Sequence, residues 1–351
     1  MSTTSYARLL PLVLLAACSF GASTTVDLLS YPAAPGVLET DAAGDYVYIG
    51  LNDGGSRWSP KTTIQVYDAA GVKVRRKAAV TGAWAFVAVA VDPRDDTVWT
   101  LHEGGHLTQW SAGMARPLAF HSNAFAGQVP STGDVIFCDL DIAPNGTMLT
   151  TVMSDSFGSW SNHVVSRREY ISGGTGIRVY REGSVSTNPD PAIPRASCGH
   201  VSISGTEVAL LLPDHASASN DWVHLPDIVT ESDRSGRTYY RLDWNPFGVS
   251  PTPTLELTPY DKTKFGFVDI ARNPTGFAIV ESSLYGSSTS EVSLYTESLG
   301  FQDDMVWRDI RSVEAASWVH PTTGDQLWWA GREPIVSSPY TPDAIGTVEI
   351  Y

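Results

Sequence analysis

Short stretches in which apolar and polar residues alternate recur along the whole chain. The sequences IQVY (64–67), IRVY (177–180), VSLY (292–295) and VEIY (348–351) share one pattern, and LTQW (107–110) and YRLD (240–243) are looser copies. Alternation with a period of two residues is typical of a β-strand. Most copies are followed by a turn that contains glycine, as in DAAG (68–71). The pattern therefore predicts repeated strands joined by tight turns.

A second repeated unit lies upstream of these copies and consists of a strand, a tight turn and another strand. The turns fall at residues 41–45, 92–96, 143–146, 204–206, 273–276 and 321–325. Repeats of about 45–65 residues, with three strands visible and a fourth implied, are typical of β-propellers. The six units predict an all-β fold, a six-bladed β-propeller over residues 25–351.

The two ends of the chain fit this prediction. The last unit stops at Tyr351, on its third strand, whereas a spare strand, TVDLL (25–29), precedes the first unit. We expect the N-terminal strand to complete the C-terminal blade, because pairing would leave neither strand as an open sheet edge.

The segments VAVDPRDDTVWTL (89–101) and IQVYDAAG (64–71) resemble sequences of the NHL-like and TolB-like six-bladed propellers of bacterial envelope proteins. The resemblance covers the architecture of residues 25–351. It implies no particular activity, because propellers serve as enzymes, receptors and scaffolds alike.

The first residues predict a signal peptide. Arg8 is followed by the apolar run LLPLVLLAA (9–17) and then by Cys18. The run is too short to span a bilayer and suits the apolar core of a signal peptide. LAAC (15–18) resembles the lipobox of bacterial lipoproteins. The alternative is an ordinary secretory signal that happens to contain a cysteine.

The lipobox resemblance implies a specific fate for the N-terminus. Residues 1–17 would be removed, Cys18 would carry fatty acyl groups such as palmitate, and residues 18–24 would form a tether. Ser19 after the cysteine implies sorting to the outer membrane of a Gram-negative envelope, on the periplasmic or the surface-exposed side. We therefore expect the protein to contact the membrane through a lipid anchor.

Charge excludes one class of partner. The net charge of the chain is −15, and nucleic-acid binding requires a basic face. The excess of acids suits a soluble exterior or a surface that attracts cations.

The sequence HEGGH (102–106) matches the H-E-x-x-H motif of zinc proteases. That motif works on a helix, which places both histidines on one side. Here it joins two predicted strands, and two glycines cost a helix about 1 kcal/mol each relative to alanine. Because Gly-Gly is favoured in hairpins, we predict a blade turn and not a protease zinc site. The alternative is a surface turn that picks up metal adventitiously.

The connections between second and third strands are expected at residues 52–63, 102–106, 154–176, 213–237, 282–290 and 331–346, and five of these six are long. Long loops on one side of a rigid scaffold are where function concentrates. Each connection begins near an acid: Asp53, Glu103, Asp155, Asp214, Glu281 and Glu333. Trp58, Trp160 and Trp222 lie in the same segments.

Two interpretations of these acids remain open. Aspartate starts loops well, and the acids then have no joint role. Alternatively they form a ring at the channel mouth that binds Ca²⁺ or supplies a general acid–base pair. Tryptophans beside carboxylates suit a glycan, and carboxylate pairs also hydrolyse glycosides.

The predicted function is a binding or scaffold propeller, anchored in the outer membrane, that recognises a protein or glycan ligand through its long-loop face. The alternative is an extracytoplasmic hydrolase that acts on a glycan or ester at the acidic mouth, with help from Ca²⁺. No nucleophile and base could be paired from the sequence, which favours binding.

Cys138 and Cys198 occupy equivalent positions in the third and fourth units. An oxidising envelope favours a disulfide, whereas equivalent residues of neighbouring blades are not expected to face each other, and a disulfide needs close Cα atoms. A disulfide and two buried thiols both remain open.

Overall fold

The protein is described by a computed structural model. It describes residues 24–28, 36–43, 46–52, 62–68, 73–78, 86–126, 129, 135–144, 146–156, 159–168, 179–185, 199–205, 207–212, 221–224, 228–232, 238–242, 255–257, 265–273, 276–283, 289–296, 301–308, 310–319, 326–334 and 346–350. Apart from two short 3-10 turns, η1 (Glu103–Gly105) and η2 (Ala112–Met114), the regular structure of these residues is β-strand. The all-β prediction is confirmed.

The described strands form six four-stranded antiparallel sheets and one separate hairpin. Sheet 1 contains β2 (Gly36–Ala43), β3 (Tyr46–Asn52), β4 (Thr62–Asp68) and β5 (Lys73–Ala78). Sheet 2 contains β6 (Phe86–Val91), β7 (Val98–His102), β8 (His106–Trp110) and β9 (Pro117–His121). Sheet 3 contains β10 (Val135–Ile142), β11 (Thr147–Ser156), β12 (Ser159–Arg168) and β13 (Val179–Val185).

The second half of the chain repeats this order with one insertion. Sheet 4 contains β14 (His200–Ser204), β15 (Glu207–Leu212), β16 (Asp221–His224) and β19 (Leu255–Leu257), and the hairpin of β17 (Ile228–Ser232) and β18 (Thr238–Leu242) is inserted before β19. Sheet 5 contains β20 (Phe265–Asn273), β21 (Gly276–Ser283), β22 (Thr289–Thr296) and β23 (Phe301–Arg308). Sheet 6 contains β24 (Ile310–Val319), β25 (Gln326–Pro334), β26 (Gly346–Ile350) and β1 (Thr24–Leu28).

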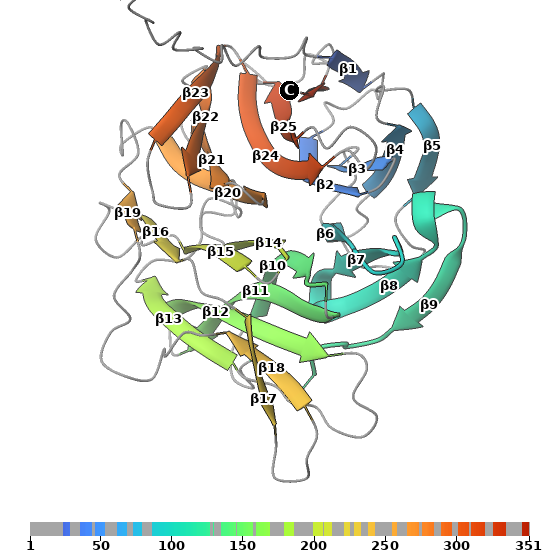
Figure 1. Cartoon of the computed structure of the whole chain (residues 1–351), viewed down its shortest axis with the longest axis vertical. Helices are drawn as coiled ribbons and strands as arrows, with labels where there is room; N and C mark the ends of the chain where they lie inside the picture. Colours follow the sequence, from blue (N-terminus) through green and yellow to red (C-terminus); the bar gives the residue numbers. More distant parts are fainter. Residues whose placement is uncertain are drawn as a thin grey trace, which may run out of the picture.

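The first strand of each sheet lies innermost (Figure 1). These strands are β2, β6, β10, β14, β20 and β24. Each contacts the first strand of the next sheet, and β24 contacts β2. In the last sheet, β1 pairs antiparallel with β26, so that Val26 lies opposite Val348. Residues from the two ends of the described chain therefore share one sheet.

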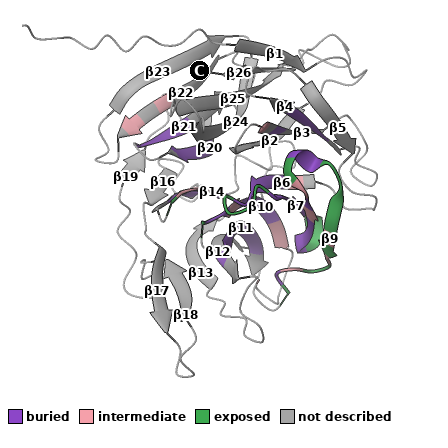
Figure 2. Ribbon diagram, turned by 45° about the vertical axis from the view of Figure 1, so that its right-hand side comes forward, coloured by how far each residue is buried: buried purple, intermediate pink, exposed green. Residues whose placement is uncertain are grey.

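Apolar side chains fill the space between neighbouring sheets. Between sheets 2 and 3, Trp99, Leu101 and Leu107 pack with Leu140 and Val152 in one buried cluster. Burial of each such side chain contributes about 1.5–3 kcal/mol. The strand β7 is buried along its whole length, whereas the outer strand β9 is largely exposed (Figure 2). In sheet 2, therefore, the central strand β7 is buried and the outer strand is not.

A bulge interrupts the first strand in five of the sheets described. The register shifts fall at Val37/Glu39, Phe86/Ala88, Phe137/Asp139, Phe267/Asp269 and Ser312/Glu314. A bulge inserts one residue and re-aims the side chains that follow it. In sheets 3 and 5 the residue after the bulge is an aspartate, and this places two acids inside the fold.

The structure corrects the predicted connections of sheets 3 and 4. The expected long loop at 154–176 is mostly strand, because β11 ends at Ser156 and β12 begins at Ser159. IRVY (177–180) overlaps the fourth strand β13, and YRLD (240–243) overlaps β18 of the inserted hairpin. The prediction that five connections between second and third strands are long is therefore wrong. The sequence of β12, SWSNHVVSRR, is mostly polar, and cross-strand pairing overrides its weak strand pattern.

The HEGGH segment is a turn between two strands, as predicted. His102 pairs with His106 across β7 and β8, and η1 lies between them. Gly104 and Gly105 have φ angles of 75° and 71°, which a residue with a side chain rarely adopts. A Cβ atom on Gly105 would lie 2.5 Å from Cζ of Phe137. Both glycines are therefore required by the turn. No helix of the described residues is long and apolar enough to cross a membrane.

Candidate metal centre

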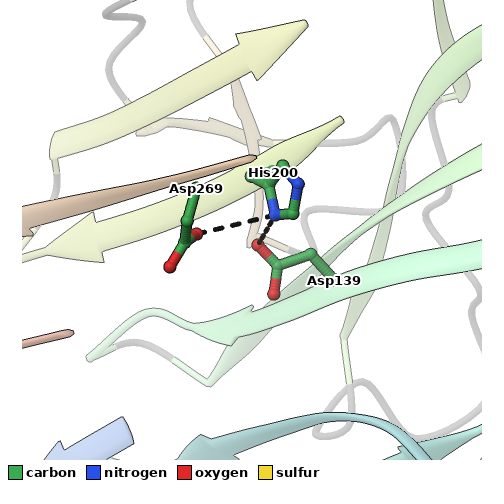
Figure 3. Close-up of side chains that lie close together, drawn as sticks. All are labelled: Asp139, His200 and Asp269. Atoms are coloured by element: carbon green, nitrogen blue, oxygen red, sulfur yellow. Dashed lines mark ion pairs between the residues drawn. The ribbon is translucent and has the colours of Figure 1, made fainter. Parts of the chain in front are cut away.

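Three chemically active side chains meet where sheets 3, 4 and 5 adjoin. Asp139 lies on β10, His200 begins β14, and Asp269 lies on β20. Successive first strands thus contribute one residue each, and in β10 and β20 the residue follows the bulge. Figure 3 shows the imidazole of His200 between the two carboxylates.

The three side chains are close but not in direct hydrogen bonds with one another. Nδ1 of His200 lies 3.7 Å from Oδ2 of Asp139 and 3.5 Å from Oδ1 of Asp269. One ligand atom from each residue lies within 4.8 Å of the other two. The exposed fractions are 3% for Asp139, 1% for His200 and 2% for Asp269. The centre is therefore almost closed to solvent.

Backbone N–H groups hold the two carboxylates in place. Oδ1 of Asp139 accepts a hydrogen bond from the N–H of Leu140 at 2.7 Å, and Oδ2 accepts one from Val201 at 2.8 Å. Oδ1 of Asp269 accepts one from Ile270 at 2.8 Å. These bonds fix the orientation of the two carboxyl groups. The bond from Val201 also ties β10 to β14.

Neither ring nitrogen of His200 has a hydrogen-bond partner among the described residues. Leaving a buried polar atom unpaired costs about 1–3 kcal/mol, and nearly all buried polar groups in native proteins are paired. A buried imidazole that faces two carboxylates without a bond therefore points to a partner that binds all three.

Asp141 offers a comparison within the same strand. Its Oδ1 accepts from the N–H of Ile142 at 2.7 Å and its Oδ2 from Ile203 at 2.6 Å. It thus ties β10 to β14 as Asp139 does, but it is not one of the three clustered residues. The cluster therefore includes Asp139 but not Asp141, which lies two residues further along β10.

The residues predicted for a carboxylate mouth are only partly described. Asp53, Trp58 and Asp214 lie outside the described residues, as does Cys18. Glu103 is exposed in η1. Asp155 pairs with Trp160 near the hairpin end of β11, and Trp222 pairs with Leu212. Glu281 and Glu333 lie within β21 and β25, opposite Phe267 and Arg311. Convergence of these acids, and a Ca²⁺ site among them, remain predictions.

The histidines of the HEGGH segment are engaged within their own sheet. Nε2 of His102 lies 3.0 Å from Oγ1 of Thr100, and burial lowers the pKa of His102 to about 4. Nδ1 of His106 accepts a hydrogen bond from the N–H of Asn123 at 3.2 Å, and its ring stacks on Phe120. These contacts agree with a structural turn.

Sequence reasoning missed the three clustered residues because they lie inside strands. One signal could have found them. Each lies four residues before the start of its predicted turn, at 143 − 139, 204 − 200 and 273 − 269. A charged or titratable residue at the same place in three first strands suggests a shared site. The loops drew attention instead because function usually concentrates there.

Comparisons with known proteins give no function for this chain. No protein-family model matches the chain, and no curated protein matches it. Among solved structures, U3-55K has a TM-score of 0.42 and 12% identity, covering 90% of this chain and 80% of that one. The WD40 repeats of RRP9 have a TM-score of 0.48 and 10% identity, covering 93% and 96%. A subtype N11 neuraminidase-like protein of A/flat-faced bat/Peru/033/2010 (H18N11) has a TM-score of 0.46 and 10% identity, covering 93% and 92%. At these TM-scores and identities the matches transfer neither a family nor an activity.

Proposed function

We propose that this protein binds a divalent transition-metal ion between Asp139, His200 and Asp269. The observation that carries the proposal is the buried imidazole of His200, whose two nitrogens lack hydrogen-bond partners among the described residues while Nδ1 faces two carboxylates. A bound ion would give that nitrogen a partner.

Charge supports the same conclusion. Two carboxylates that are both nearly inaccessible to solvent would together carry two negative charges. Buried charges in proteins are paired or coordinate metals. A divalent cation, with a neutral imidazole as third ligand, would balance the two carboxylates.

The donor set indicates the class of ion. Imidazole nitrogen suits zinc, iron, copper and nickel, whereas calcium takes six to eight oxygen ligands. Donors about 2.0–2.2 Å from a tetrahedral zinc ion lie about 3.4 Å apart. The separations of 3.5 and 3.7 Å from Nδ1 of His200 fit this spacing. We therefore favour zinc at this centre.

Burial supports a binding or scaffold role over hydrolysis. A substrate needs access to the metal and to an open ligand position, whereas the side chains here are at most 3% exposed. The ion would join three sheets of the scaffold. The connecting loops at the surface would then recognise the ligand, which would be a protein or a glycan.

The architecture proposed for this role is a closed six-bladed propeller. Six sheets in chain order, contacts between successive first strands, and the pairing of β1 with β26 support it.

For location, we propose a lipoprotein anchored through Cys18 in the outer membrane. That proposal rests on the LAAC sequence at 15–18.

Metal content and stability test the central proposal. Protein purified without chelator should contain about one zinc per chain by mass spectrometry of the metals. Protein treated with EDTA should regain stability on addition of zinc, by about 2.7 kcal/mol when free zinc is one hundred times Kd. His200→Ala and Asp139→Asn should lose this gain.

Asp141→Asn is the matched control. It removes a carboxylate that accepts a hydrogen bond from β14, as Asp139 does, but lies outside the cluster. It should keep the response to zinc. A wild-type protein that neither contains nor responds to zinc, manganese or iron would refute the proposal, and so would an equal loss in Asp141→Asn and Asp139→Asn.

A further inference from the structure

Cys138 occupies the bulge that presents Asp139. The register of β10 with β11 shifts between Phe137 and Asp139, so Cys138 is the inserted residue. Its side chain is buried and takes part in a disulfide. The bulges of β2, β6, β20 and β24 contain Leu38, Val87, Val268 and Val313 at this place. Among the described first-strand bulges, only the one in sheet 3 therefore contains a cysteine.

The partner of Cys138 follows from the described neighbours. The chain has three cysteines, so the partner is Cys18 or Cys198, and both lie outside the described residues. Thr151, the cross-strand partner of Asp139, donates a hydrogen bond from Oγ1 to the carbonyl of Gly199. Cys198 directly precedes Gly199 in the chain, so the sequence sets it beside a residue that is hydrogen-bonded to β11. A disulfide needs Cα atoms about 4.4–6.8 Å apart.

We infer that Cys138 pairs with Cys198 and that this disulfide is a positioning element of the metal centre. The inference rests on the proposed metal binding. Asp139 directly follows Cys138, and His200 is two residues after Cys198. The bond would thus join the two segments that supply two of the three ligands. In forming it, two thiols lose two protons and two electrons to a disulfide oxidant, as an oxidising envelope provides.

Positioning matters because metal sites tolerate little error. Ligand distances must fall within about 0.2 Å of their ideal values. The hydrogen bond from Val201 to Asp139 already holds β10 to β14 at the level of the ligands. The disulfide adds a covalent bond beside it, on the strand where a bulge makes the backbone irregular. Removal of such supporting groups typically weakens metal affinity by about 10–100-fold.

The first test is the connectivity. Proteolysis of the non-reduced protein, followed by mass spectrometry, should give one linked pair of peptides that contain Cys138 and Cys198. A link between Cys138 and Cys18 would overturn the inference.

The second test is metal affinity in the double variant Cys138→Ser/Cys198→Ser, which leaves no free thiol at the site. Its affinity for zinc should fall at least tenfold, and the visible spectrum of bound Co²⁺ should change. Val66→Ala is the control, because Val66 is buried in the cluster between sheets 1 and 2. It should lower stability and leave both metal readouts unchanged.

Wild-type protein reduced with a phosphine and alkylated provides the same comparison if the double variant does not fold. The phosphine takes up the oxygen of water and delivers two electrons, which leaves two thiols for alkylation. Unchanged zinc affinity in the folded variant or the alkylated protein would overturn the positioning role and leave the metal site intact. Absence of metal binding in the oxidised wild type would overturn both.

Discussion

Gly105→Ala should destabilise the protein through a specific overlap with Phe137. Gly105 has a φ of 71°, and forcing a residue with a side chain into this region costs about 1–2 kcal/mol. The new Cβ would lie 2.5 Å from Cζ and 3.0 Å from Cε2 of Phe137. The Phe137 ring packs against Phe125 with 5.7 Å between centroids, inside the cluster between sheets 2 and 3. Because the new Cβ displaces the Phe137 ring within a packed core, overpacking should lower the free energy of unfolding by about 1–3 kcal/mol.

Gly205→Ala separates the two effects. Gly205 has a φ of 63°, and a Cβ there would meet nothing within 4 Å. The free energy of unfolding of this variant should therefore fall only by the cost of the backbone conformation, about 1–2 kcal/mol. Gly105→Ala should lose about 2–5 kcal/mol in total, the sum of backbone and overpacking costs.

Urea unfolding at pH 7, followed by tryptophan fluorescence, measures the free energy of unfolding of both variants. Adding Phe137→Leu to Gly105→Ala should recover part of the loss, because the smaller side chain vacates the overlap. That coupling should appear in a double-mutant cycle. Equal destabilisation by Gly105→Ala and Gly205→Ala, with no coupling to Phe137→Leu, would show that the turn does not pack on sheet 3 as described.

Four further outcomes are expected. Burial lowers the pKa of His102 to about 4 in the folded protein, whereas the pKa of an unperturbed histidine is about 6.5. Stability should therefore be full above about pH 6.5 and fall by about 3 kcal/mol as the pH drops towards 4. In a pH series of urea titrations, His102→Gln should show a shallower fall. Cys18→Ser should abolish labelling by a fatty-acid analogue and release the protein from membranes; retained label and membrane binding would contradict lipidation. Deleting residues 346–351 should lower the melting temperature strongly by removing β26, and an unchanged melting temperature would argue against its role in sheet 6. If Asp155 and Asp214 converge, Ca²⁺ should stabilise the wild type in a thermal-shift assay but not the double asparagine variant.

The predictable part of the fold was local. Turn glycines and alternating strands predicted an all-β chain, and the paired glycines of HEGGH predicted a turn, because each signal spans a few residues. The third strand of sheet 3 was missed because β12 has few apolar residues and is held by its neighbours. Asp139, His200 and Asp269 are separated by 61 and 69 residues along the chain (200 − 139 and 269 − 200). The contacts between first strands and the position of two bulges bring them together. No single stretch of sequence shows this, and only a comparison of equivalent positions in the three repeats indicates it.

The pairing of β1 with β26 sets an order of assembly. Sheets 1 to 5 are each built from one continuous stretch of chain, whereas sheet 6 joins Leu28 to Gly346. Bringing together residues separated by 346 − 28 = 318 positions costs about 4 kcal/mol more entropy than closing a five-residue connection. During synthesis β1 must therefore wait until β26 has been made. A chain whose synthesis has not reached β26 can form sheets 1 to 5, but β1 is then left unpaired, and an unpaired strand favours association with other chains.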